Sequence, residues 1–206
     1  NVDFTGASRP TVATAGVPDI GAYEFSTPTP TPPPATQGGT LANGSTTTYS
    51  QGGLQYGAIS WGPDGTVPTS VTFNVFTGVT PPGGGTAPRA LIYWDIVPTG
   101  GSGYSYDITL YYDETQLNGI PESRLHPAKS DDGGTSWHAF LVEGTGSGQF
   151  QRNTANNTLT IYGLTSFSLF GMGDLDDPFP VELTSFTASS RGRNIELNWS
   201  TATEVN

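Results

Sequence analysis

The sequence predicts an all-β protein whose central domain is a Greek-key-like β-sandwich. Of the 206 residues, 28 are Gly and 17 are Pro, a composition typical of many short strands joined by turns. After residue 37, runs of alternating apolar and polar residues recur at spacings of about 10 to 20 residues, bounded by Gly, Pro, Asn and Asp. The one helical turn expected lies at 114–118, so long helices are disfavoured.

The alternation predicts individual strands. Val71, Phe73 and Val75 lie on one face of one strand, because successive side chains of a strand point to opposite faces. Another strand carries one face made of Tyr104, Tyr106, Ile108, Leu110 and Tyr112. Further strands are expected at 54–60, 89–97, 123–130, 137–143, 158–162 and 166–172. About eight or nine strands suit one sandwich.

A Thr/Pro-rich segment at 26–37 marks a domain boundary. Each Pro fixes φ and removes an amide donor, so 26–34 is expected to form an extended polyproline-type rod. At about 3.1 Å per residue, this rod holds its neighbours roughly 28 Å apart. The segment separates residues 1–25 from a sandwich domain at 38–175, and residues 176–206 open a third module.

Charge and composition exclude several classes of function. Seven Lys and Arg against 18 Asp and Glu give a net charge of −11, which repels phosphate backbones and argues against nucleic-acid partners. The longest apolar runs, such as 90–94, fall far short of the roughly 20 residues of a membrane helix, so no membrane insertion is expected. The absence of Cys excludes disulfides, zinc-thiolate sites and thiol catalysis.

Three segments resemble secreted bacterial proteins. Residues 19–24 (Asp-Ile-Gly-Ala-Tyr-Glu), with Arg9-Pro10 upstream, resemble the closing segment of secreted right-handed parallel β-helix proteins, including the group called choice-of-anchor Q. Residues 180–188 and 196–206 resemble the start of the fibronectin-III-like module of Bacteroidetes-type secreted proteins. The sandwich resembles the domain found just upstream of that module, on 103–112, the Trp137 hairpin and 164–171.

These resemblances imply an arrangement and a location. Residues 1–25 would end a β-helix, and strands at 182–188 and 194–200 would open the fibronectin-III-like module, which the chain leaves truncated. That module usually precedes a C-terminal sorting domain read by the type IX secretion system. The resemblance therefore implies a secreted or cell-surface protein whose secretion signal and sorting domain lie outside this chain.

No set of nucleophile, base and orienting group is evident, so the segment is predicted to be noncatalytic. His126 and His138 have no second ligand at a metal-like spacing, and both are expected at surface or hairpin positions. Asp113 and Glu114 are adjacent on a turn and would need to flank a cleft to hydrolyse a glycoside. Any activity of the parent protein would lie upstream of residue 1.

Residues 130–137 (Ser-Asp-Asp-Gly-Gly-Thr-Ser-Trp) resemble the Asp box, with Ser136 in place of Thr. In such a hairpin the carboxylate caps turn amides, a Gly takes the positive φ and the Trp packs beneath. A structural turn formed by Asp132, Gly134 and Trp137 is therefore expected.

Two groups of residues are candidates for ligand binding. Trp61, Trp94, Tyr111 and Tyr112 could form a sugar-stacking platform, since one of the two adjacent Tyr residues must point outward. Asp174, Asp176 and Asp177 could bind Ca²⁺, a cation that takes several carboxylate oxygens, or could simply be a solvated interdomain linker. No other cofactor is expected.

The leading functional hypothesis is a noncatalytic spacer that links a β-helix domain to a C-terminal sorting or anchoring region. An alternative is a carbohydrate-binding module that tethers a polysaccharide-acting β-helix enzyme to a polysaccharide or cell-surface glycan. A further alternative is an adhesive or self-assembling surface protein that uses unpaired strand edges.

Overall fold

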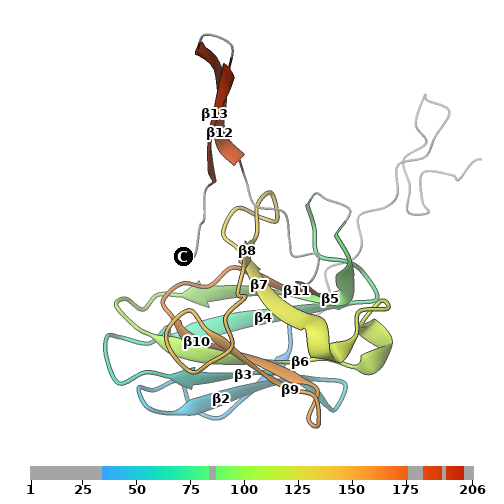
Figure 1. Cartoon of the computed structure of the whole chain (residues 1–206). Coiled ribbons are helices and arrows are strands. Elements are labelled where there is room, and N and C mark those ends of the chain that lie inside the picture. The colour runs from blue at the N-terminus through green and yellow to red at the C-terminus, as the bar shows by residue number, and fades with distance from the viewer. Residues whose placement is uncertain (1–33, 84–86, 176–182, 192–193, 202–206) are drawn as a thin grey trace, which may run out of the picture. The chain divides into compact units, whose positions relative to one another are not determined.

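Two antiparallel sheets lie face to face in the computed structural model, which describes residues 34–83, 87–175, 183–191 and 194–201 (Figure 1). The predicted all-β class and sandwich architecture are confirmed, since the helical elements in these ranges are two short 3-10 turns. The β-helix ending expected at 1–25 lies outside the described residues, as does the rod expected at 26–34 except for its last residue.

The first sheet has six strands, which run in space in the order β1 (Thr36–Gly38), β2 (Thr46–Gln51), β3 (Leu54–Trp61), β6 (Tyr106–Tyr111), β10 (Thr158–Leu164) and β9 (Phe150–Asn153). The second has five, in the order β4 (Ser70–Thr77), β5 (Arg89–Thr99), β11 (Leu169–Asp174), β7 (Leu125–Ser130) and β8 (His138–Ala139). The chain changes sheet after β3, β5, β6, β8 and β10, so strands that are neighbours in sequence often lie in different layers.

The two inner faces meet in an apolar core. Val71, Phe73 and Val75 of β4 are buried on one face, as predicted. The face predicted from Tyr104 to Tyr112 is also an inner one, although the paired strand β6 is shorter. Across the core, Tyr49 stacks on Phe73 with ring centroids 4.5 Å apart, which places an aromatic contact between the sheets.

Some strands depart from the prediction. The strands β2 and β9 were not predicted, because each has only one large apolar residue on its inner face, Tyr49 and Phe150 respectively. The strand expected at 137–143 is reduced to β8. Here Phe140 still donates its backbone N–H to Pro127 O at 3.0 Å, but Val142 then accepts the N–H of Phe150 at 3.0 Å. The segment is short in either sheet because it crosses between them.

Contacts between the layers also close the open sides of the sandwich. The strand β1 pairs with β2, while the preceding residue, Ala35, donates its N–H to Phe73 O of β4 at 2.8 Å. On the other side, Arg152 of β9 donates from Nε to Leu125 O of β7 at 2.9 Å. Residues 35–37, which the sequence assigns to the linker, therefore pair with the sandwich through their backbone, a contact that leaves no apolar pattern.

Two 3-10 turns, η1 (Glu114–Gln116) and η2 (Glu122–Arg124), connect β6 to β7. The helical turn expected at 114–118 is η1, and Asp113 caps it by accepting the N–H of Thr115 at 2.8 Å. In return, the Gln116 side chain accepts the Asp113 N–H at 3.0 Å, which completes a capping box.

The chain continues in an antiparallel hairpin of β12 (Leu183–Arg191) and β13 (Asn194–Thr201). Strands were expected at 182–188 and 194–200, so the two elements are confirmed and the first extends three residues further than expected. Any module that opens with two antiparallel strands would show this pairing. The fibronectin-III-like character of the module therefore stays a prediction.

Replacing Gly57 by Ala should destabilise the sandwich. A Cβ at this buried position of β3 would lie 2.2 Å from Cζ of Phe73, the ring that stacks on Tyr49. We expect a loss of about 1 to 3 kcal/mol in the free energy of unfolding, the usual cost of overpacking a core. Urea unfolding measures it, with Ala58→Ser on the outer face of the same strand as the matched control. Equal midpoints for both variants would contradict this packing.

Candidate functional site

Trp61 and Trp94, two of the four aromatic residues expected to form a sugar-stacking platform, lie in the core. The Trp61 side chain is buried and its Nε1 donates to Thr47 Oγ1 at 2.6 Å. Trp94 is fully buried, with Nε1 donating to the backbone oxygen of Tyr56 at 3.1 Å. Both indoles have a partner for the N–H and neither offers a ring face to a ligand, so the expectation is corrected for these residues.

The adjacent tyrosines divide between the two faces of the sheet. Tyr112 is buried, and its hydroxyl donates to Glu122 Oε1 at 2.8 Å. Tyr111 is partly exposed on the outer face of the six-stranded sheet. Strand alternation required one ring of the pair to point outward, and that ring is Tyr111. It is the one member of the expected platform that remains available.

In the turn at 130–137, the carboxylate of Asp132 is occupied by hydrogen bonds from the turn itself. Asp132 accepts the N–H of Ser136 at 2.9 and 3.0 Å on its two oxygens and the Ser136 hydroxyl at 2.6 Å. Ser130 Oγ donates to Asp132 at 2.8 Å and accepts the N–H of Gly134 at 2.8 Å. The hydrogen bonds from Ser136, with that from Ser130, lower the pKa of Asp132 to about 2. Asp132 therefore acts as a cap for the turn.

The rest of that turn packs on the outer face of the five-stranded sheet. Gly134 has φ +96°, and its carbonyl accepts the Nε1 proton of the buried Trp137 at 3.2 Å. A Cβ at Gly171 of β11 would lie 2.8 Å from Pro81 Cγ and 3.2 Å from Trp137 Cζ3. Arg89 fastens the proline loop by donating to Gly83 O at 2.8 Å. A glycine in the sheet thus makes room for the Trp and Pro that cover it.

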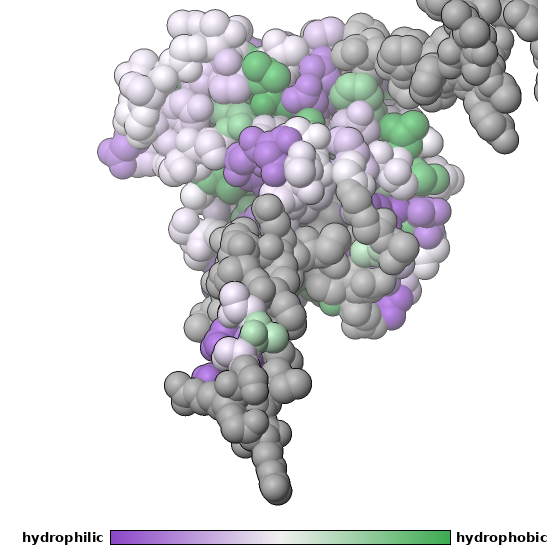
Figure 2. Space-filling view, turned by 90° about the horizontal axis from the view of Figure 1, so that it is seen from above, coloured by the Kyte–Doolittle hydropathy of each residue, from purple (hydrophilic) through white to green (hydrophobic). Residues whose placement is uncertain are grey.

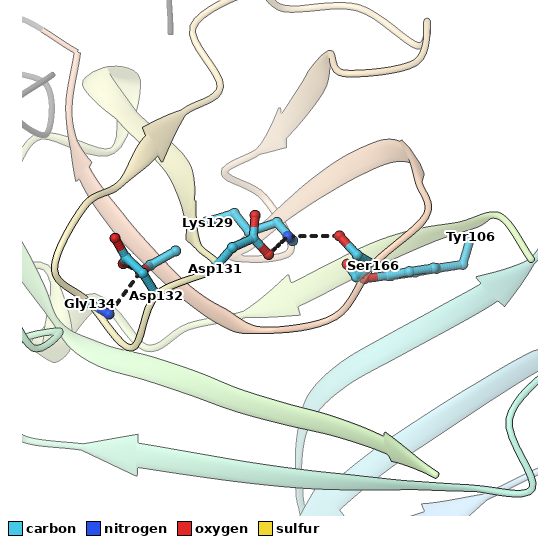
Figure 3. Close-up of polar contacts among 7 residues, drawn as sticks. Tyr106, Lys129, Asp131, Asp132, Gly134 and Ser166 are labelled. Carbon is cyan, nitrogen blue, oxygen red and sulfur yellow. Dashed lines mark hydrogen bonds and ion pairs between the residues drawn. The ribbon is translucent and has the colours of Figure 1, made fainter. Parts of the chain in front are cut away.

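A second polar cluster joins β7 to the loop before β11 (Figure 3). The side chain of Lys129 is 7% exposed, and its ammonium donates to the carboxylate of Asp131 and to Ser166 Oγ, the latter at 3.0 Å. The Tyr106 hydroxyl donates to the backbone oxygen of Ser166 at 2.8 Å. These contacts tie the loop at 165–168 to both sheets.

The pairing of Ser166 with Lys129 resembles the start of a nucleophile and base. A lysine base needs an uncharged amine, because an ammonium has no lone pair to accept the hydroxyl proton. Lys129 donates to two oxygens at once, one of them a carboxylate, and this is the bonding of an ammonium. The cluster is accordingly an ion pair that holds a loop.

His126 is the clearest departure from its expected place. It was expected near the surface, but it lies on β7 opposite Gly173 of β11 and is fully buried. Burial lowers its pKa from 6.5 to about 4; the nearby Asp174 carboxylate opposes this shift and Arg152 adds to it. His138 is half-buried, and burial also lowers its pKa.

Asp174 is a strand residue and not part of a cation-binding loop. It ends β11, is buried, and accepts a hydrogen bond from Arg124 Nη2 at 2.7 Å. Asp176 and Asp177 lie outside the described residues. Within the ranges described, no three His, Asp or Glu side chains gather closely enough to hold a metal ion. The expected solvated carboxylate is thus corrected for Asp174, which is committed to an ion pair.

The outer face of the six-stranded sheet holds a different set of polar groups, which sequence reasoning missed. Its members project away from the core on β2, β3, β6, β10 and β9, and all are polar except Ala58: Thr46, Thr48, Ala58, Ser60, Asp107, Thr109, Tyr111, Thr158, Thr160, Tyr162, Gln151 and Asn153. We call this set the hydroxyl face. The alternation in 158–162 could have shown part of it, but the unpredicted β2 and β9 supply the remainder.

At the β9 edge, the hydroxyl face opens into a groove with a volume of about 660 Å³. Side chains of β9 and β10 line one side, and the turn at 154–155 and the segment at 143–144 line the rest. Glu143 and Arg152 form an ion pair of 2.8 Å at this rim. The groove is therefore polar, and the charges at its edge neutralise each other.

The outside of the molecule has no large apolar patch in the view of Figure 2. Seen from above, hydrophobic residues there form small separate patches among residues of intermediate hydropathy. None of the helical elements in the described part of the chain has the length and apolar character to cross a membrane.

Comparisons of the chain with protein-family models, curated proteins and solved structures find no match. The family resemblances of the sequence therefore stay predictions.

Replacing His126 by Gln should remove a pH-dependent part of the stability. Because the pKa of His126 is about 4 in the folded protein against an ordinary 6.5, the unfolded chain takes up the proton first as the pH falls. The stabilising contribution is complete above about pH 6.5 and declines by roughly 3 kcal/mol towards pH 4. Urea unfolding of parent and variant across this range measures it; parallel pH profiles would contradict the assignment.

Proposed function

We propose that the described sandwich is a noncatalytic spacer module of a secreted or cell-surface bacterial protein, placed between a β-helix domain and a C-terminal sorting region. One observation carries the proposal. Four of the titratable side chains that the sequence analysis singled out are held in structural contacts or buried in the described residues. Asp113 caps η1, Asp132 caps its turn, Asp174 pairs with Arg124 and His126 is buried.

The edges of the two sheets support a spacer better than a self-assembling surface protein. A long, unpaired edge strand is the usual template for pairing with another chain. Here β1, β8 and β9 are edge strands of two to four residues. The longer edge strand β4 receives a hydrogen bond from Ala35. Within these two sheets, β4 is thus the one edge strand long enough to pair with a second copy.

The carbohydrate-binding alternative loses most of the residues first considered for it. Trp61, Trp94 and Tyr112 are core residues, and their rings stabilise the sandwich. Tyr111 remains, together with the hydroxyl face on which it lies. This role is compatible with a spacer, since a module that separates two domains can also contact a polymer.

An exchange experiment tests the spacer proposal. In the full-length parent protein, residues 36–174 are replaced by an unrelated β-sandwich of similar length, and a second variant lacks the module. We expect the exchanged protein to be exported and displayed like the parent, whereas the deletion should impair display. Loss of export or upstream activity on exchange would show that this sandwich contributes more than spacing.

The noncatalytic part of the proposal has its own test. The purified 206-residue chain is incubated with polysaccharides and with chromogenic glycosides and esters, next to a Lys129→Met, Ser166→Ala double variant. We expect no turnover by either protein above a heat-inactivated control. Turnover by the parent that the double variant loses would identify the Lys129 cluster as catalytic and overturn the proposal.

A further inference from the structure

We propose that the hydroxyl face binds a neutral, hydroxyl-rich polysaccharide, with Tyr111 and Tyr162 as stacking residues and the groove at the β9 edge as the deepest part of the site. This role goes beyond that of a spacer.

The register of the sheet places the polar groups of the face in a row. Thr160 lies opposite Gln151 on one side and Thr109 on the other, and Thr109 lies opposite Ala58, which in turn lies opposite Thr48. Neighbouring strands are about 4.8 Å apart, so Gln151, Thr160 and Thr109 present amide and hydroxyl groups at short intervals, and the methyl group of Ala58 separates them from Thr48. Each hydroxyl is both a donor and an acceptor, as are the hydroxyls of a sugar.

Two tyrosines flank this row. Tyr111 is two residues beyond Thr109 on β6, and Tyr162 is two residues beyond Thr160 on the antiparallel strand β10, so the rings lie on opposite sides of the row. Four residues of strand separate them, or about 14 Å along the strands. That span suits an oligosaccharide better than a single sugar ring. Tyrosine rings supply apolar contact area at low cost in conformational entropy.

The side chains next to Tyr162 are held in place before any ligand arrives. The Tyr162 hydroxyl donates to Gln151 Oε1 at 2.5 Å, and the exposed Gln151 keeps its amide N–H groups as donors. Thr109 and Thr160 share a hydrogen bond of 2.9 Å between their hydroxyls. Groups that are already oriented lose less entropy on binding, which favours recognition by a flat face.

The charges on the chain and beside the hydroxyl face favour a neutral polymer over an acidic one. The carboxylate of Asp107 is the one acidic group among the residues of the hydroxyl face, and it accepts the N–H of Gly163 at 2.8 Å. At the groove, Arg152 is engaged by Glu143. With a net charge of −11 on the chain, an acidic polysaccharide would be repelled. A neutral glycan meets no such penalty, and its hydroxyl groups match those of the face.

The groove adds depth to an otherwise flat surface. Its volume of about 660 Å³ lies within the range of small-molecule sites, roughly 300 to 1,000 Å³. Gln151, Asn153, Thr158 and Thr160 belong both to the groove and to the hydroxyl face. A chain lying across the face can therefore place one sugar unit in the groove without leaving the row of hydroxyls.

Affinity gel electrophoresis of the whole 206-residue chain tests the proposal. The gels contain hydroxyethylcellulose, xyloglucan or galactomannan as neutral probes, and polygalacturonate or alginate as acidic ones. The variant is Tyr111→Ala with Tyr162→Ala. Its matched control is Tyr93→Ala, a partly exposed tyrosine on the outer face of the other sheet. Urea unfolding confirms that each variant is folded at the temperature of the gel.

We expect at least one neutral polymer to retard the parent and Tyr93→Ala equally. The double variant should bind it about 5- to 160-fold more weakly, the combined effect of two aromatic contacts of about 0.5 to 1.5 kcal/mol each. Three results would each overturn the proposal: no retardation by any neutral polymer, equal or stronger retardation by the acidic ones, or unchanged binding by the folded double variant. None of them bears on the spacer role, which the exchange of the module tests separately.

Discussion

The two-residue alternation of side chains along each strand is the constraint on which this structure depends. On β5, Ala90, Ile92, Trp94 and Ile96 all face inward and are essentially removed from water. The same period on β6 buries Tyr106, Ile108 and Leu110 and turns Asp107, Thr109 and Tyr111 outward. One pattern thus produces both the core and the hydroxyl face, since a slip of one residue would exchange them.

Polar side chains hold the loops, turns and layers that the apolar core does not fix in place. Arg152 reaches across the layers to Leu125, Lys129 fastens the loop that carries Ser166, and Asp132 organises the turn that places Trp137. Each of these residues could have suggested chemistry if considered alone. Buried or partly buried polar groups are costly without partners, and here those partners come from the fold itself.

The sequence predicts the strands that are rich in large apolar residues better than it predicts the other strands and the site. Strands with several large apolar residues, such as β4 and β5, follow from their alternation. The strands β2 and β9 are not predicted, because a single inward aromatic residue in each is a weak signal of a strand. The burial of His126 is not predicted for another reason. A histidine before a proline resembles a surface residue, and its burial depends on β11 pairing with β7. The hydroxyl face depends on register across five strands, which is a property of the assembled sheet.

We propose that the outer side of the six-stranded sheet is the working surface of a noncatalytic module. An amide NMR titration of the ¹⁵N-labelled chain with an oligosaccharide from the neutral polymer it binds tests this most directly. The largest shift changes should fall on β6, β9 and β10, and the oligosaccharide should be recovered intact. Changes centred on the Asp132 turn or the five-stranded sheet, or cleavage of the sugar, would contradict it.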